Sequence, residues 1–263
     1  MTNSTALPTL DTEAALRDLG VADDTLAAEE KRRLDEDGYL ALPGILSPSQ
    51  IEAIRERLAE LLAIEKENAG KEVHQEVGTA RLSNLVDKGE IFRVFFTHPR
   101  VLAGVAHVLR GQIKLSSLNS RAALPGQGLQ ALHADWHAAV QPGDYLVCNS
   151  IWLLDDFTPD NGPTRVVPGS HRTGKMPQDV MVDPKSTHPD EKLVTAAAGT
   201  VVVFNSHTWH GGTLNHTSAP RRAVHSYWTR RDQPQQLNQR QFLGAETRRS
   251  FSPAVRFLLD VEE

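Results

Sequence analysis

The feature that most constrains this chain is a histidine and an aspartate two residues apart, His133 and Asp135. If residues 129–137 form a β-strand, both side chains point to one face, because successive strand side chains alternate. A third ligand is available late in the chain at His210. Two histidines and one carboxylate on one face of a metal leave other coordination positions open, as in non-haem iron(II) oxygenases. The sequence therefore predicts a metal site at these three residues.

An H-x-D triplet alone is a weak signal, since many surface strands contain one. The order strengthens it: a close pair, a long gap, His210 and then Arg221, eleven residues further on. Two other histidines compete for the ligand positions. His137 shares the expected strand face and could replace a ligand, although lining the pocket is the preferred interpretation. His207 is the rival to His210, but the Gly-Gly pair after His210 and the spacing to Arg221 favour His210.

The same motifs, taken in order, carry a resemblance to a known family. They are His133-x-Asp135, residues 160–171 and 199–204, Trp209 to Gly212, Asn215 and Arg221. The chain resembles the phytanoyl-CoA dioxygenase-like Fe(II)/2-oxoglutarate oxygenases, which include ectoine hydroxylases, from about residue 33 to about residue 231. The resemblance implies a mainly β fold with flanking helices around a double-stranded β-helix, or jelly-roll, core of the cupin type. It also implies Fe(II), 2-oxoglutarate as co-substrate, and O2.

Arg221 is assigned to the co-substrate. 2-Oxoglutarate takes two metal positions with its keto acid end and needs a cation for its far carboxylate, which an arginine fork matches. A strand starting just after His210 can bring Arg221 beside the metal, whereas Arg222 would face the other side. The carboxylate of Asp135 favours hydroxylation or another oxidation over halogenation, because related halogenases have a small residue at that position.

Further pocket residues are expected. The resemblance implies a contact between Trp152 and 2-oxoglutarate, with a core role as the equal alternative, and Asn119 and Ser226 are expected as further polar contacts. The substrate pocket is expected to include His137, Trp136, Met176 and Met181. No catalytic residue beyond the metal site is expected. His171 and Cys148 are interpreted as structural residues.

One domain is expected within the 263 residues, at 11–263 after a flexible N-terminus at 1–10. Its parts are a helical segment (11–110), the jelly-roll core (111–231) and a C-terminal extension (232–263). Residues 69–90 are expected at the pocket mouth. Residues 172–192 are polar, contain three prolines and predict a lid over the substrate.

Composition narrows the possible partners and location. The net charge of −5 argues against a general nucleic-acid binder. A single cysteine excludes a disulfide framework and favours the cytoplasm, and no signal peptide or apolar run of membrane-spanning length is recognised. The expected partner is a small-molecule substrate, and the expected state is a monomer or homodimer.

The leading hypothesis is hydroxylation of an unactivated C–H bond in an amino acid, an amine or a natural-product intermediate, with release of succinate and CO2. The same chemistry could instead give desaturation or ring formation. A non-catalytic cupin-like binding protein is the first alternative, and Arg221 beside an intact triad disfavours it. A zinc hydrolase is the second, but only His137 is an obvious general base. No CoA-binding signature is recognised, so the family name does not identify the substrate.

Overall fold

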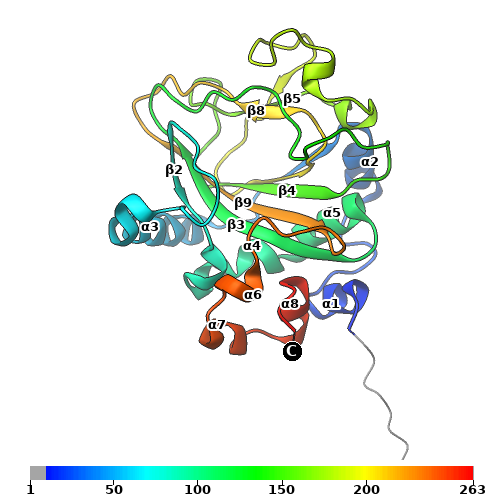
Figure 1. Cartoon of the computed structure of the whole chain (residues 1–263), viewed down its shortest axis with the longest axis vertical. Helices are drawn as coiled ribbons and strands as arrows, with labels where there is room; N and C mark the ends of the chain where they lie inside the picture. The colour runs from blue at the N-terminus through cyan, green and yellow to red at the C-terminus, as the bar shows by residue number, and fades with distance from the viewer. Residues whose placement is uncertain (1–9, 263) are drawn as a thin grey trace, which may run out of the picture.

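The computed structural model describes residues 10–262, and the flexible N-terminus predicted at 1–10 lies outside them except for Leu10. Two antiparallel sheets form the centre of the molecule (Figure 1). The strands of the larger sheet run in the order β1-β7-β4-β9-β3-β2, and the smaller sheet, β6-β5-β8, lies over it. The predicted double-stranded β-helix with flanking helices is confirmed.

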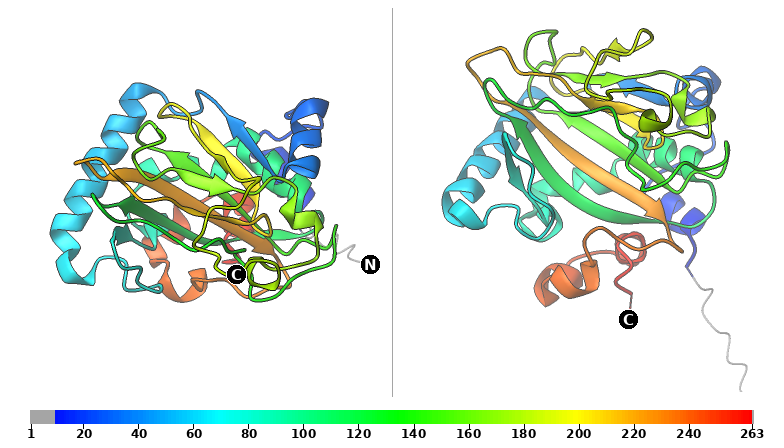
Figure 2. Two further views of the ribbon diagram at one scale, coloured as in Figure 1. Left: turned by 90° about the horizontal axis from the view of Figure 1, so that it is seen from above. Right: turned by 45° about the horizontal axis from the view of Figure 1, so that its top comes forward.

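The larger sheet consists of β1 (Tyr39–Leu42), β2 (Thr79–Leu82), β3 (Ile113–Ala123), β4 (Val147–Leu153), β7 (Val201–Asn205) and β9 (Arg221–Arg230). The smaller one consists of β5 (Thr164–Val166), β6 (Lys192–Leu193) and β8 (His210–Gly212). Figure 2 shows the long strands β3 and β9 running side by side beneath the smaller sheet.

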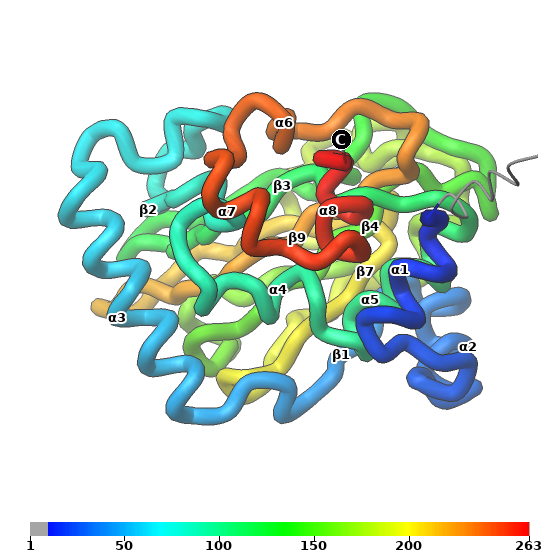
Figure 3. Tube along the Cα trace, turned by 90° about the horizontal axis from the view of Figure 1, so that it is seen from below, coloured from blue at the N-terminus to red at the C-terminus, as the bar shows by residue number. Residues whose placement is uncertain are grey.

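Helices lie on the face of the larger sheet that points away from the smaller one and along its sides, where α2 and α3 are found (Figure 1 and Figure 3). The helices are α1 (Thr12–Asp18), α2 (Ala28–Glu36), α3 (Pro48–Glu65), α4 (Val94–Thr97), α5 (Pro99–Leu109), α6 (Gln239–Phe242), α7 (Ala245–Arg249) and α8 (Pro253–Leu258). The start of α3 is fixed by a reciprocal pair, in which Ser47 Oγ accepts from the Gln50 N–H and Gln50 Oε1 accepts from the Ser47 N–H. Among residues 10–262, no helix has the length and apolarity needed to cross a membrane.

Strand alternation gives the larger sheet two different faces. On β4 and β9, the side chains of Cys148, Trp152, Val224 and Trp228 enter the core shared with the helices. The intervening positions point toward the smaller sheet instead. The core side is apolar and tightly packed, and the ring of Trp152 meets Phe95 edge-on at 4.9 Å between centroids. The sheet is therefore held from its outer face, which leaves its inner face free to line a cavity.

One strand prediction is wrong. Residues 129–137 form a loop in which only His133 pairs, through an isolated bridge to His210. The reason is that successive backbone groups bond to different segments. The Leu132 N–H donates to Pro184 O, and the Asp135 N–H donates to Ser206 O. The two proposed ligands on this segment are thus positioned by separate backbone anchors and not by strand alternation.

Candidate metal centre

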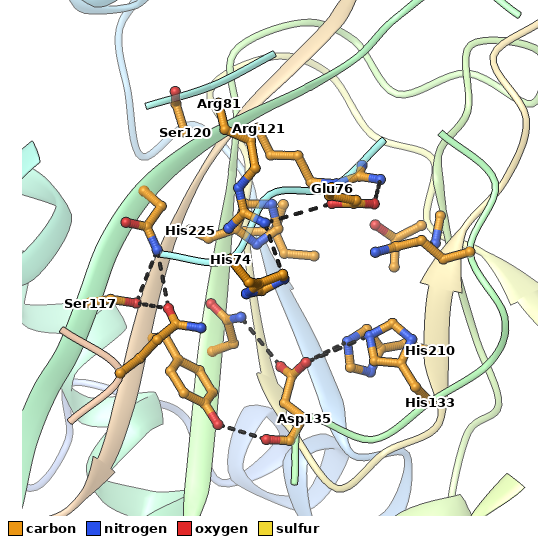
Figure 4. A pocket seen from close by; sticks show the side chains of 18 of the residues that line it. His74, Glu76, Arg81, Ser117, Ser120, Arg121, His133, Asp135, His210 and His225 are labelled. Carbon is orange, nitrogen blue, oxygen red and sulfur yellow. Dashed lines mark hydrogen bonds and ion pairs between the residues drawn. The ribbon is translucent and has the colours of Figure 1, made fainter. Parts of the chain in front are cut away.

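Three side chains predicted as ligands meet at one end of the space between the sheets (Figure 4). Oδ1 of Asp135 lies 3.6 Å from Nε2 of His133 and 3.5 Å from Nε2 of His210. Within residues 10–262 this is the only group of three His, Cys, Asp or Glu residues whose donor atoms all lie within 4.8 Å of one another. Metal–ligand bonds of about 2 Å fit a single ion among these atoms.

Backbone carbonyls orient both imidazole rings. His133 Nδ1 lies 2.9 Å from Ala131 O, and His210 Nδ1 lies 2.8 Å from Thr208 O. A carbonyl only accepts hydrogen bonds, so Nδ1 of each ring must carry the proton and donate it. The lone pair is then on Nε2, which faces Asp135. This second-shell arrangement fixes the tautomer that a metal ligand requires.

The three groups compete for protons when no metal is bound. Burial opposes ionisation of Asp135, but His210 and His133 hold the pKa of its carboxyl below the usual range. Burial lowers the pKa of His133, and His210 lowers it further. For His210, Asp135 outweighs burial, so its pKa is raised. A divalent cation can take the place of the shared proton, which is how metal binding couples to deprotonation of its ligands.

Glycines bring the two ligand segments together. A Cβ on Gly211 would come within 2.9 Å of Ala131 O, and one on Gly212 within 2.5 Å of Gly128 O. Both carbonyls belong to the irregular segment between β3 and β4 that carries His133. The Gly-Gly pair after His210 thus allows this segment to approach β8 closely enough for the two histidines to meet.

The ligand side chains open into a cavity of about 320 Å³. Its floor is the inner face of the larger sheet, with Asn119 from β3, Asn149 and Ile151 from β4, and His225 and Tyr227 from β9. Two of these support the ligand Asp135: the Tyr227 hydroxyl donates to its backbone oxygen at 2.7 Å, and Asn149 Nδ2 lies 3.4 Å from its Oδ2. No role was predicted for these two residues; Tyr227 could have been found, because it lies six positions from Arg221 on β9 and shares its face.

Arg221 also lines the cavity, and its side chain is buried. Its Nε and Nη2 both donate to Gly162 O, at 3.1 and 2.9 Å, and the guanidinium lies 4.2 Å from the ring centroid of Phe157. Among residues 10–262, no carboxylate lies within 4.0 Å of it. Burial and the nearby positive charge of Arg121 lower the pKa of Arg221 to about 9. A buried guanidinium without a counter-ion is a ready site for the carboxylate of a ligand.

Two residues predicted to contact 2-oxoglutarate, Trp152 and Ser226, lie on the opposite face of the sheet. Trp152 Nε1 donates to Ser226 Oγ at 3.1 Å, and Ser226 Oγ donates to Phe95 O at 2.6 Å. The correction follows from strand parity, because Ser226 is five positions from Arg221 and must face the other way. The core role left open for Trp152 is the one the structure supports. Asn119, the third predicted contact, does line the cavity.

The residues predicted for the substrate pocket lie outside the cavity lining. His137 is exposed, and its ring centroid lies 4.9 Å from that of Trp136 with the ring planes tilted by 39°. Because residues 129–137 form a loop, no strand alternation holds His137 on the same face as His133 and Asp135. Met181 packs on the cluster around Trp209, and Met176 borders a separate small hollow. The segment that does line the cavity mouth is the one expected there, 69–90, through His74, Glu76 and Arg81.

The rival ligand His207 is engaged elsewhere. Its Nε2 accepts the Leu146 N–H at 3.1 Å, and burial lowers its pKa to about 4. His171 is buried and its Nε2 donates to Asp35 O at 3.1 Å, in keeping with a structural role. Cys148 is buried, and burial raises the pKa of its thiol. None of these three groups points to a second metal site.

The segment 172–192 is anchored next to the metal centre. Arg165 is buried and donates to the backbone oxygens of Pro184, Lys185 and Ser186, and Pro184 O also accepts the Leu132 N–H. Leu132 directly precedes the ligand His133. These contacts tie the segment to the site, and its role as a lid stays a prediction.

Comparison with known proteins agrees with this geometry. The family model for phytanoyl-CoA dioxygenase (PhyH) matches residues 34–223. The chain is 29% identical to dioxygenase af480 of Aspergillus fumigatus, over 92% of this chain and 80% of that protein. It is 27% identical to the ectoine dioxygenase of Halomonas elongata, over 88% of this chain and 80% of that one.

Solved structures show the same fold. The crystal structure of HygX from Streptomyces hygroscopicus with nickel and 2-oxoglutarate bound superposes with a TM-score of 0.67. It covers 80% of this chain and 89% of HygX at 18% identity. With the family model spanning most of the sequence, the chain belongs to the phytanoyl-CoA dioxygenase family of iron- and 2-oxoglutarate-dependent oxygenases.

Proposed function

We propose that the protein hydroxylates an unactivated C–H bond of a small molecule, consuming 2-oxoglutarate and O2 and releasing succinate and CO2. The observation that carries this proposal is the combination of two features in one cavity. One is a three-ligand cluster with an open side, and the other is a buried guanidinium, Arg221, without a carboxylate partner among the described residues.

The residues present fit an iron(II) centre. The Nε2 atoms of His133 and His210 and a carboxylate oxygen of Asp135 would hold the metal. Bound iron with 2-oxoglutarate and O2 supplies the oxidising power for the reaction. All three ligand side chains line the cavity, so the open side of the cluster faces it.

The protein's own part is to position the reactants and keep water out. Arg221 would bind the far carboxylate of 2-oxoglutarate, and its contacts to Gly162 and Phe157 hold the guanidinium in place. Tyr227 and Asn149 would keep Asp135 in one orientation. The retained carboxylate of Asp135 favours hydroxylation over halogenation, since it occupies the position that a halide would need.

Succinate release tests the proposal. Protein loaded anaerobically with Fe(II) is mixed with 2-oxoglutarate, then with air and a panel of amino acids, amines and natural-product intermediates. The expected result is succinate formation that requires both Fe(II) and 2-oxoglutarate and that increases with at least one compound. Binding of both without succinate under any condition would favour the non-catalytic binding protein instead. Succinate formed with zinc in place of iron would contradict the proposed chemistry.

A further inference from the structure

The cavity has a second charged wall, formed by Glu76, Arg81 and Arg121 with His74 at the mouth (Figure 4). Arg121 binds Glu76 with two hydrogen bonds, from Nε at 2.9 Å and from Nη2 at 2.6 Å. Arg81 is engaged more loosely. Its Nη1 lies 3.7 Å from Glu76 Oε2 and 3.4 Å from His74 Nε2. Its Nε is buried without a hydrogen-bond partner among the described residues. Arg81 thus has unused donors in a guanidinium fork.

The charges of the cavity leave one positive charge unbalanced. The lining carries three arginines, Arg81, Arg121 and Arg221, against two carboxylates, Glu76 and Asp135. An iron(II) ion and a 2-oxoglutarate dianion cancel each other, and the histidines are counted as neutral. Since burial makes an uncompensated charge costly, the remaining positive charge favours an anionic group on the substrate.

Two asparagines on the cavity floor add no contact for a ligand. Asn119 Nδ2 donates to Ser117 Oγ at 3.1 Å and to Gln236 Oε1 at 3.2 Å. The Oδ1 atoms of Asn119 and Asn149 have no hydrogen-bond partner among the described residues, and both are buried beneath the cavity surface, where a molecule in the cavity does not reach them. The charge on Arg81 therefore carries the assignment.

The wall lies on the cavity side of the sheet. Arg81 is paired with Arg121 across β2 and β3, and both side chains line the cavity. We propose that this wall is the substrate subsite, and that it takes a small organic acid with its carboxylate on Arg81. The assignment rests on the proposed function.

Matched pairs of ligands test the subsite. Protein loaded anaerobically with Fe(II) and saturating 2-oxoglutarate is titrated calorimetrically with common L-amino acids, 4-aminobutyrate and the corresponding hydroxy acids. Each acid is compared with its primary carboxamide. At least one acid should bind ~10-fold or more tightly than its carboxamide, because a hydrogen bond to a charged group typically contributes about 1.5–3 kcal/mol. In Arg81→Gln this preference should fall to within ~2-fold, and Arg81→Lys should retain part of it.

Two controls keep this test separate from the proposed function. Arg81→Gln should bind 2-oxoglutarate as the unaltered protein does, because the co-substrate is assigned to Arg221. Arg110→Gln removes a charge from a side chain that is 68% exposed and should change neither affinity. If no acid is preferred over its carboxamide, or if the preference survives in Arg81→Gln, the subsite proposal is overturned. Failure of 2-oxoglutarate to bind the unaltered protein would instead overturn the proposed function on which the subsite rests.

Discussion

The two faces of the larger sheet differ in how their polar groups are satisfied. On the outer face Trp152 and Ser226 hydrogen-bond each other and the helix layer, and Trp228 Nε1 is an exception, without a partner within residues 10–262. On the inner face the floor carries three buried polar atoms that have no partner in the described part of the chain, on Asn119, Asn149 and His225. Buried polar groups are normally paired, so such a concentration marks a face that is not optimised for stability alone. The outer face should therefore determine stability and the inner face function.

The largest expected effect is on the inner side. Replacing His210 with alanine removes one metal ligand from a lined cavity, so the fold should persist while iron and activity are lost. Mutation of outer-shell partners alone typically costs 10–100-fold in metal affinity, so the loss here should exceed about 100-fold. Iron content and succinate formation measure it. Unchanged iron content in His210→Ala would contradict the proposed triad.

A matching change on the outer face should lower the stability of the fold and leave ligand binding largely intact. Trp152→Ala leaves a cavity in the core beside Phe95 and should lower the free energy of unfolding by about 3–5 kcal/mol. Urea denaturation measures the loss. Folded Trp152→Ala protein should still bind 2-oxoglutarate within a few-fold of the unaltered affinity. A selective loss of 2-oxoglutarate binding without loss of stability would restore Trp152 as a co-substrate contact.

Arg221→Gln should affect the ligand more than the fold. Losing a charge-assisted contact to a buried carboxylate typically costs about 2–5 kcal/mol, so 2-oxoglutarate should bind roughly 30-fold or more weakly. Iron binding should change little, and Arg221→Lys should recover only part of the affinity because it lacks the fork. Equilibrium binding of each ligand separates these effects. Normal 2-oxoglutarate affinity in Arg221→Gln would transfer the role to another arginine of the cavity.

The smallest expected changes in stability come from His225 and Ser226, which are adjacent in sequence but point to opposite faces of the sheet. Burial and the nearby positive charges of Arg121 and Arg221 together lower the pKa of His225 from 6.5 to about 3. Below 6.5 the unfolded chain takes up a proton that the folded chain does not, so stability falls as the pH drops toward 3. Between pH 7 and pH 5 this group should account for about 2 kcal/mol, which His225→Gln should remove.

Ser226→Ala is the matched control variant, because Ser226 points to the outer face of the sheet. It should cost about 1–2 kcal/mol at either pH, through the lost hydrogen bond to Phe95 O, and leave the pH dependence unchanged. Unfolding by urea at both pH values gives the comparison. An unaltered pH slope in His225→Gln would show that His225 is not the buried neutral group assumed here.

Much of the site could be predicted from sequence because its chemistry is carried by residue type and spacing. His133, Asp135, His210 and Arg221 were identified in this way. Ser226 was assigned wrongly, although its odd spacing from Arg221 along β9 would have excluded it and pointed to His225 and Tyr227 instead. The loop at 129–137 could not be predicted, since its shape depends on backbone bonds to Ser206 and Pro184, which are distant in sequence. For the same reason the pairing of Glu76 with Arg121 had no local signal.

The most direct test of the central claim is an anaerobic calorimetric titration of 2-oxoglutarate into the protein with and without Fe(II). The inner face is proposed to hold metal and co-substrate together, through the triad at one end and Arg221 at the other. We predict binding at a single site that depends on Fe(II) and is lost in His210→Ala. Binding of equal strength without the metal, or no binding with it, would contradict this account.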